Sequence, residues 1–253
     1  MAKSVAANTE SMYNEFKFGH FSYGEKRKKF DQLLVELIQG SSWDGKKIYD
    51  IGCGSGFHME VCAELGIKKD QMIGVDIAPG NITSLTERGF KAQRADVQAL
   101  PFADNSADLT ICNGVIHHVD DPKKAFRELV RITKPGGRIY LGLCNKWNPY
   151  FYLVHRATFP LRYAYWNVDK RVADLILPFF RAAIQLVSYA TFGEFMNKET
   201  VRRFLMDQIM VPKEFLFSRK MLEDWTREEG GTVEEFKYNR YFLMFSSVLR
   251  VNK

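Results

Sequence analysis

The sequence predicts an α/β fold built on a mostly parallel sheet, and three observations support that prediction. Short apolar runs typical of buried strands alternate with helical stretches between Lys46 and Cys144. Three glycines at alternate positions, Gly52, Gly54 and Gly56, directly follow the first of these strands. Polar residues stand at the ends of successive predicted strands. Because alternating strands and helices form parallel sheets covered on both faces, the 253 residues are expected to bury one large core.

The predicted core elements follow one another with short connections. Pro79 suits the first turn of one helix and Gly89 suits its end. Strands are expected at residues 48–51, 72–77, 91–96, 109–113 and 138–144, with a turn at 134–137 before the last of them. Helices are expected at residues 25–39, 57–65, 79–88 and 121–132.

The alternation stops after Cys144. Residues 145–217 hold sixteen of the 35 aromatic residues and no convincing buried strand, which predicts a helical cap inserted after the fifth strand. Within the cap, apolar spacing from Val172 to Ala190 indicates one helix, which Pro178 is expected to kink or divide. Three polar residues in that helix argue against a membrane span: Asp174, Arg181 and Gln185.

The last part of the chain returns to the sheet. Ser218 can cap a helix that runs to Glu229 and ends at Gly230. Two strands follow, at residues 232–238 and 242–251, with only a tight connection between them. Such a connection forces an antiparallel pair at one edge of the sheet.

The net charge of +6 comes from one segment. Residues 146–220 contain twelve Lys and Arg against six Asp and Glu, an excess equal to the whole net charge. These basic residues are mixed with aromatic residues of the buried type and form no stripe, so nucleic acid is not an expected partner.

Cysteine spacing limits the chemistry further. The chain has four cysteines and no C-x-x-C pair, which argues against a zinc site and a disulfide framework. We therefore expect no metal site. We expect the protein to work in a reducing, cytoplasmic setting. The N-terminus shows no apolar run of the signal-peptide kind.

The spacing of the glycines restricts the ligand of the loop. A dinucleotide loop, G-x-G-x-x-G, would place its third glycine at position 57, where this chain has Phe57. The loop also lacks the lysine of a phosphate-binding P-loop. Asp50, just before the glycines, would repel phosphate but can hold an ammonium group or a ribose hydroxyl. A phosphate ligand is therefore the weaker interpretation.

The stretch from Asp50 to Gly56 resembles motif I of the class I S-adenosylmethionine-dependent methyltransferases. Four further stretches resemble that family's later motifs, in the same order: residues 73–77, 94–102, 107–119 and 129–138. The resemblance covers about residues 46–144 and is closest to the small-molecule and ubiquinone/menaquinone methyltransferases. It implies a Rossmann-like seven-stranded sheet of order 3-2-1-4-5-7-6, S-adenosylmethionine as cofactor, and S-adenosylhomocysteine as product.

The resemblance also implies which residues hold the cofactor. Ligands of parallel α/β sheets bind at the carboxyl ends of the strands, and a carboxylate about twenty residues beyond the loop suits the ribose hydroxyls. The expected contacts are Asp50, Gly52, Cys53, Gly54 and Gly56 at the methionine moiety, Asp76 at the ribose, Ile77, Asp96 and Val97 at the adenine, and Asn113 at the fourth strand end. Asp108, at the start of its strand, resembles a structural position.

Candidates for the acceptor side lie on three segments. His117 and His118 follow the fourth strand, and Tyr13 belongs to an aromatic N-terminal stretch that, by resemblance, folds over the site. These three residues are the catalytic candidates, although a base is needed only if the acceptor loses a proton early in the reaction. Three cap residues are the expected acceptor contacts: Trp147, Tyr150 and His155.

These expectations divide the chain into four parts. They are an N-terminal segment and helix over the site (1–45), the cofactor-binding core (46–144), the cap (145–217), and a final helix with the antiparallel strand pair (218–253). The expected function is methyl transfer to a small organic acceptor with apolar or aromatic surface and an anionic group. One alternative is methylation of a lipid or quinone at a membrane surface, because a basic, aromatic, amphipathic segment can lie in a bilayer interface. Another is a cofactor-binding scaffold without catalysis.

Overall fold

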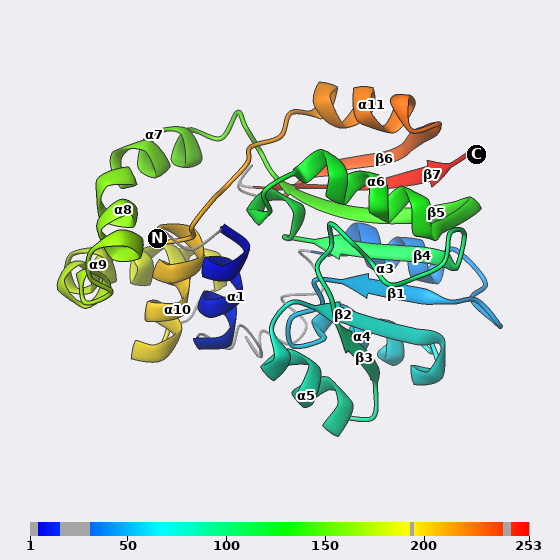
Figure 1. Cartoon of the computed structure of the whole chain (residues 1–253), viewed down its shortest axis with the longest axis horizontal. Coiled ribbons are helices and arrows are strands. Elements are labelled where there is room, and N and C mark those ends of the chain that lie inside the picture. The colour runs from blue at the N-terminus through cyan, green and yellow to red at the C-terminus, as the bar shows by residue number, and fades with distance from the viewer. Residues whose placement is uncertain (1–4, 16–30, 193–194, 240–243, 253) are drawn as a thin grey trace.

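A seven-stranded sheet forms the centre of the α/β part of the chain (Figure 1). The computed structural model describes residues 5–15, 31–192, 195–239 and 244–252. The strand order is β3-β2-β1-β4-β5-β7-β6, as the resemblance implied, and β7 runs antiparallel to both of its neighbours. The strands are β1 (Ile48–Ile51), β2 (Met72–Asp76), β3 (Lys91–Arg94), β4 (Ala107–Asn113), β5 (Thr133–Cys144), β6 (Gly231–Tyr238) and β7 (Met244–Val251).

Helices cover both faces of this sheet. Those of the core are α3 (Gln32–Gln39), α4 (Phe57–Glu64), α5 (Pro79–Glu87), α6 (Pro122–Ile132) and α11 (Arg219–Glu228). Those outside it are α1 (Val5–Glu15), α7 (Pro149–Ala157), α8 (Phe159–Asn167), α9 (Val172–Phe192) and α10 (Lys198–Gln208). The expected helix at 25–39 is confirmed from Gln32 onward, and residues 25–30 lie outside the described part of the chain.

Alternation along the strands separates two apolar layers. Tyr49 and Ile51 belong to the layer that packs on α6 and α11, whereas Ile48 belongs to the layer on α3, α4 and α5. Asp50 lies between Tyr49 and Ile51 in β1, so its side chain shares the α3 and α4 side with Ile48. This alternation brings Asp50 toward α4, beneath the glycine loop.

The start of β5 differs from the expectation. The predicted turn at 134–137 is part of β5, which begins at Thr133. Gly136 has a φ of +74°, and the register of β5 against β4 shifts between Ala107 and Leu109. Residues 134–137 have no register partner in β4, so an irregular stretch joins two paired parts of β5 where we expected a free turn.

The cap predicted after β5 is confirmed as four helices, α7 to α10. An isolated bridge between Asn145 and Phe217 brings the two ends of the segment together beside β5. The cap has its own apolar core, which includes Met12 of α1. The N-terminal helix thus packs on the cap.

Two expectations concern the helix α9. Pro178 does not divide it, since α9 runs unbroken from Val172 to Phe192, and a kink at Pro178 stays a prediction. Leu177 and Ile184, on either side of Pro178, are both buried in the cap core. Among the described residues, α9 is also the helix long and apolar enough to cross a membrane, from Val172 to Ala190. We expected Asp174, Arg181 and Gln185 to argue against a span. The composition of α9 alone does not exclude one.

Candidate functional site

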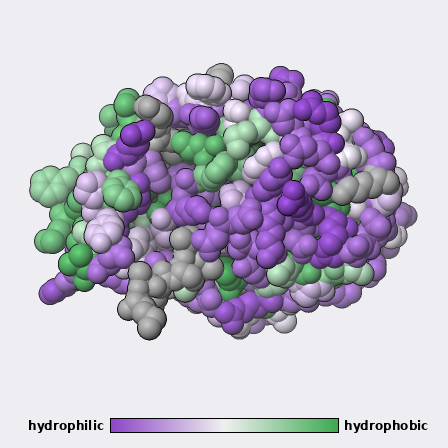
Figure 2. Space-filling model, turned by 45° about the horizontal axis from the view of Figure 1, so that its top comes forward, coloured by the Kyte–Doolittle hydropathy of each residue, from purple (hydrophilic) through white to green (hydrophobic). Residues whose placement is uncertain are grey.

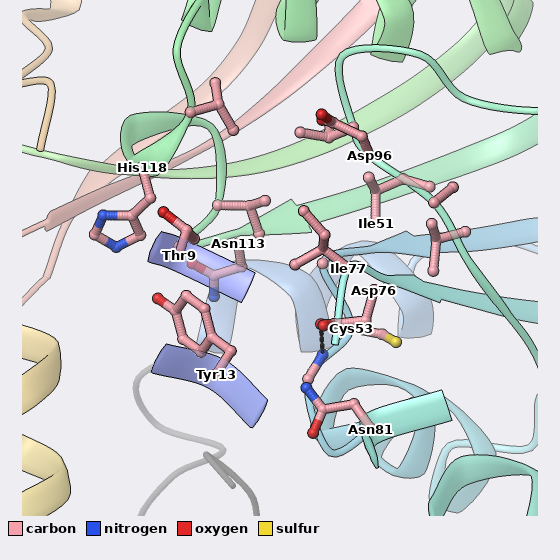
Figure 3. Close-up of a pocket in the computed structure, with 18 of the residues that line it drawn as sticks. Thr9, Tyr13, Ile51, Cys53, Asp76, Ile77, Asn81, Asp96, Asn113 and His118 are labelled. Carbon is pink, nitrogen blue, oxygen red and sulfur yellow. Dashed lines mark hydrogen bonds between the residues drawn. The ribbon is translucent and has the colours of Figure 1, made fainter. Parts of the chain in front are cut away.

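A cavity of ≈ 290 Å³ opens at the carboxyl ends of β1, β2 and β4. Its walls come from the glycine loop after β1, the residues after β2 and β3, and the end of β4. Thr9 and Tyr13 project from α1 and close one side (Figure 3). The site therefore lies at the switch in strand order, with the N-terminal helix over it, as expected for a ligand of a parallel α/β sheet.

The glycine loop has the conformation that its sequence predicts. Gly52, Gly54 and Gly56 have φ values of +71°, +51° and +83°, which L side chains rarely adopt. Gly52 and Gly54 line the cavity, as does Cys53 between them. A Cβ on Gly52 would lie 2.3 Å from a methyl of Val115, another residue of the wall. Gly56 is the N-cap of α4 and does not line the cavity, so its role is to turn the chain.

Asp76 lines the cavity at the end of β2. Its carboxylate accepts hydrogen bonds from the backbone N–H of Gly54 and of Ala78, both at 2.8 Å. Burial raises the pKa of this carboxyl, and the backbone hydrogen bonds partly offset that effect. The group is therefore a buried acceptor held in one orientation at the loop.

Asp50 lies beneath the loop and does not line the cavity. Burial raises its pKa to about 6, and His58, whose Nδ1 lies 4.0 Å from Asp50 Oδ1, acts in the opposite direction. The second oxygen of Asp50 has no hydrogen-bond partner among the described residues. A buried carboxylate in this position favours a cation in the cavity above it.

Asp50 belongs to a polar network that the sequence analysis did not predict. His58 Nε2 lies 3.6 Å from Asp31 Oδ2, and Asp31 Oδ1 accepts hydrogen bonds from Asn113 Nδ2 at 2.9 Å and Tyr140 at 3.0 Å. Asn113 is thus tied to α3 as well as exposed to the cavity. No motif marks Asp31, because α3 reaches the site only through tertiary packing.

The residues predicted at the adenine also line the cavity. They are Ile77, Asp96 and Val97. Asp96 accepts a hydrogen bond from the N–H of Gln98 at 2.8 Å, which orients its carboxylate. Asn81 and Gln98, which we did not predict, are part of the wall too. The described wall contains carboxylates but no Lys or Arg, so it suits a ligand with positive charge better than a phosphate.

Two of the three catalytic candidates meet at one side of the cavity. The rings of Tyr13 and His118 are 6.4 Å apart, and both residues line the wall (Figure 3). His118 Nδ1 lies 3.0 Å from the carbonyl oxygen of Lys213, which can only accept. Nδ1 therefore carries the proton, and Nε2 of a neutral His118 keeps its lone pair.

His117 is placed differently from His118. It is buried, does not line the cavity, and its Nε2 lies 3.5 Å from the sulfur of Cys144. Burial, reinforced by His118, holds the pKa of His117 well below its usual value. In the described part of the chain, His117, Cys144 and Glu214 also have side-chain donors within 4.8 Å of one another, a group that could hold a metal ion. Cysteine spacing did not reveal this group, because the fold alone brings it together.

Two of the three predicted acceptor contacts, Trp147 and His155, do not line the cavity. Trp147 is 71% exposed, so it neither lines the cavity nor packs in the apolar core. His155 Nε2 lies 2.8 Å from Glu214 Oε2, where it links α7 to the segment that leaves the cap. The side chain of Tyr150 lies outside the described part of the structure. The aromatic and basic composition of the cap therefore did not predict which of its side chains lie at the cavity.

Comparisons with known proteins agree with the fold. Residues 49–141 match the family model described as a methyltransferase domain. Demethylmenaquinone methyltransferase of Renibacterium salmoninarum is 31% identical over 120 residues, which cover 47% of this chain and 48% of that protein. The chain thus spans about half the length of the curated relatives it matches.

Two solved structures extend the similarity to the whole fold. A methyltransferase in complex with the Haloferax volcanii Trm112 methyltransferase activator has a TM-score of 0.63 at 14% identity, covering 97% of this chain and 98% of the other. Magnesium protoporphyrin IX methyltransferase of Synechocystis, with bound S-adenosylmethionine, has a TM-score of 0.58 at 11% identity, covering 99% and 98%. Residues 49–141 thus resemble a methyltransferase domain, and the two solved structures show that the whole chain shares their fold.

Proposed function

We propose that the protein transfers the methyl group of S-adenosylmethionine to a small organic acceptor and releases S-adenosylhomocysteine. The observation that carries this proposal is the charge of the cavity wall. Asp76 and Asp96 line it, Asp50 lies beneath it, and its described residues include no Lys or Arg. When bound, the cofactor supplies a positively charged sulfonium whose methyl group is open to nucleophilic attack. Such a ligand suits this wall, whereas a dinucleotide would bring phosphates toward carboxylates.

The residues of this chain hold the cofactor and orient it for the reaction. The backbone at Gly52 and Gly54 allows a ligand to approach without a side chain in the way. The carboxylate of Asp76 accepts hydrogen bonds from the ribose hydroxyls of the cofactor. Its two backbone hydrogen bonds fix the orientation of this carboxylate. Much of the rate of an in-line displacement comes from such positioning.

His118 is the group that takes a proton from the acceptor. Its Nδ1–H donates to the Lys213 carbonyl, which leaves Nε2 as the acceptor of the proton. Tyr13, Val115 and Val119 line the cavity near it and give this end an aromatic and apolar wall. We therefore propose an acceptor with an aromatic or apolar surface. An anionic group on the acceptor, which the cap's charge led us to expect, has no cationic partner in the described wall.

Transfer of a labelled methyl group tests this function. The protein is incubated with methyl-labelled S-adenosylmethionine and a fractionated small-molecule extract. We expect label in an organic-extractable fraction with wild type, and at least tenfold less with His118→Gln. If S-adenosylhomocysteine binds but no fraction takes up label, the chain is a cofactor-binding scaffold and the proposal of catalysis fails.

A further inference from the structure

The helix α9 is apolar on two opposite sides. Ala173, Leu177 and Ile184 on one side are buried in the cap core. On the other side, Phe179 and Leu186 are 83% and 70% exposed. A surface helix of a soluble protein normally has polar residues on that side. The exposed half of α9 therefore needs a contact that lies outside the described chain.

Neighbouring residues extend this exposed side of α9. We call the exposed apolar residues of α8, α9 and the segment after them the outer cap face: Phe159, Tyr163, Leu175, Phe179, Leu186, Tyr189 and Phe195. The rings of Tyr189 and Phe195 stack at 5.0 Å. Figure 2 shows hydrophobic residues gathered at the end of the molecule where Figure 1 places α8 and α9. A gathering of exposed apolar side chains of this size marks a site of interaction.

The charge of the cap favours an anionic partner. The cap, residues 145–217, carries ten Lys and Arg against six Asp and Glu, and the described cavity wall uses none of these basic residues. Arg156, Arg171 and Arg181 are exposed on the cap, although Arg171 is ion-paired with Asp169. Aromatic and aliphatic side chains beside exposed arginines match a bilayer interface, where apolar groups enter the acyl boundary and cations meet anionic headgroups. A second copy of the chain would instead bring two positively charged caps together.

The packing of α9 places it on the bilayer and not across it. Its length and composition would allow a span, and only 18% of that stretch is buried. Its buried apolar residues, however, belong to the cap core. A span would have to pull Leu177 and Ile184 out of that core. It would also carry Arg181 and the ion-paired Asp174 into hydrocarbon. The folded cap can expose only one side of α9 to lipid.

We propose that the outer cap face docks the enzyme on the surface of an anionic lipid bilayer. The acceptor then reaches the cavity from the membrane phase, which makes it a lipid-soluble molecule; this part rests on the proposed methyl transfer, whereas docking does not. If the enzyme works in the cytoplasm, as its cysteines led us to expect, the negatively charged inner leaflet supplies such a surface.

Vesicle sedimentation tests the docking with the full chain. The probes are vesicles of phosphatidylcholine alone and of phosphatidylcholine with phosphatidylglycerol, at low salt and without cofactor or acceptor. We expect wild type to pellet with the anionic vesicles, to pellet far less with the neutral ones, and to be released by alkaline carbonate. Phe179→Glu with Leu186→Glu should lower the apparent affinity at least tenfold.

A charge-matched variant distinguishes the loss of apolar side chains that enter the bilayer from the effect of added negative charge. Thr83→Glu with Thr86→Glu adds the same two charges on exposed positions of α5 and should pellet like wild type. Melting temperature and S-adenosylhomocysteine affinity should stay unchanged in both variants, which excludes misfolding. Four results would each overturn the proposal: no binding of wild type, equal loss in both variants, resistance to carbonate, or a wild-type dimer that the outer-face variant dissociates. None of these readouts depends on turnover, so failed docking leaves methyl transfer standing.

Discussion

The carboxylate of Asp76, at the end of β2, accepts a 2.8 Å hydrogen bond from the backbone N–H of Gly54 in the loop after β1. Its other oxygen accepts a bond of the same length from Ala78, the N-cap of α5. One side chain thus ties two strand ends together where the cavity opens. Because its direction is fixed, a single substitution there measures its part in ligand binding.

Asp76→Ala should weaken the binding of S-adenosylhomocysteine about tenfold to 100-fold. The expected loss is roughly 1.5–3 kcal/mol, the scale of hydrogen bonds to a charged group. Calorimetry measures it, with Asp108→Ala as the control. Asp108 holds Lys47 and Lys134 at the other end of β4, so that variant should lower the melting temperature and leave affinity unchanged. A folded Asp76→Ala protein with wild-type affinity would remove Asp76 from the site.

Gly54→Val should abolish cofactor binding, because a branched side chain would stand in the loop wall at a φ of +51°. Gly136→Val is the matched control. Gly136 also has a positive φ, of +74°, but lies in the irregular stretch of β5, where a Cβ would meet no other atom within 4 Å. Both variants should be less stable, and only the first should lose binding. Normal binding by a folded Gly54→Val protein would make the loop purely structural.

The raised pKa of Asp50 predicts a pH dependence of stability. The pKa of this carboxyl is about 6 in the folded protein, against 3.8 as the reference value, chiefly because of burial. Between these values the folded state binds more protons than the unfolded state, so the contribution of Asp50 to stability falls as pH rises from about 4 to about 6. Above that window, Asp50 ionised and buried costs stability.

Asp50→Asn should remove this dependence. The free energy of unfolding of the variant, relative to wild type, should increase from pH 4 to pH 6.5 and stay level above. Urea denaturation at several pH values measures the difference. A difference that does not change with pH would mean that Asp50 has an ordinary pKa.

The two adjacent histidines should behave differently. His118→Gln should lower turnover by about 10²-fold or more, the scale of a lost general base, with S-adenosylhomocysteine affinity unchanged. His117→Gln should mainly lower the melting temperature, because His117 is buried away from the cavity. Equal turnover of His118→Gln and wild type would show that the acceptor needs no base.

The order of the sheet, and several residues that line the cavity, could be predicted from the sequence because local pattern determines their positions. Asp76 ends β2, Asp96 lies two residues after the end of β3, and the glycines mark the loop between β1 and α4. Both carboxylates line the cavity, as their positions predicted.

The acceptor side could not be predicted in the same way. His155 and Trp147 were chosen because the cap follows β5, but the direction of a cap helix depends on packing between distant segments, such as Met12 against α9 and α10. His58 and Asp31 were missed for the same reason, since their network joins α3, α4 and β4. The spacing in α9 predicted a helix correctly, but an apolar stripe carries no information on whether protein or lipid covers it.

Calorimetry of wild type with S-adenosylhomocysteine and with NADH tests the central claim most directly. The cavity wall combines Asp76 and Asp96 with an aromatic end and has no described Lys or Arg. We predict saturable 1:1 binding of S-adenosylhomocysteine in the micromolar range or tighter, and NADH binding at least 100-fold weaker. Comparable or tighter binding of NADH, or no binding of S-adenosylhomocysteine by the folded protein, would contradict the assignment of this cavity.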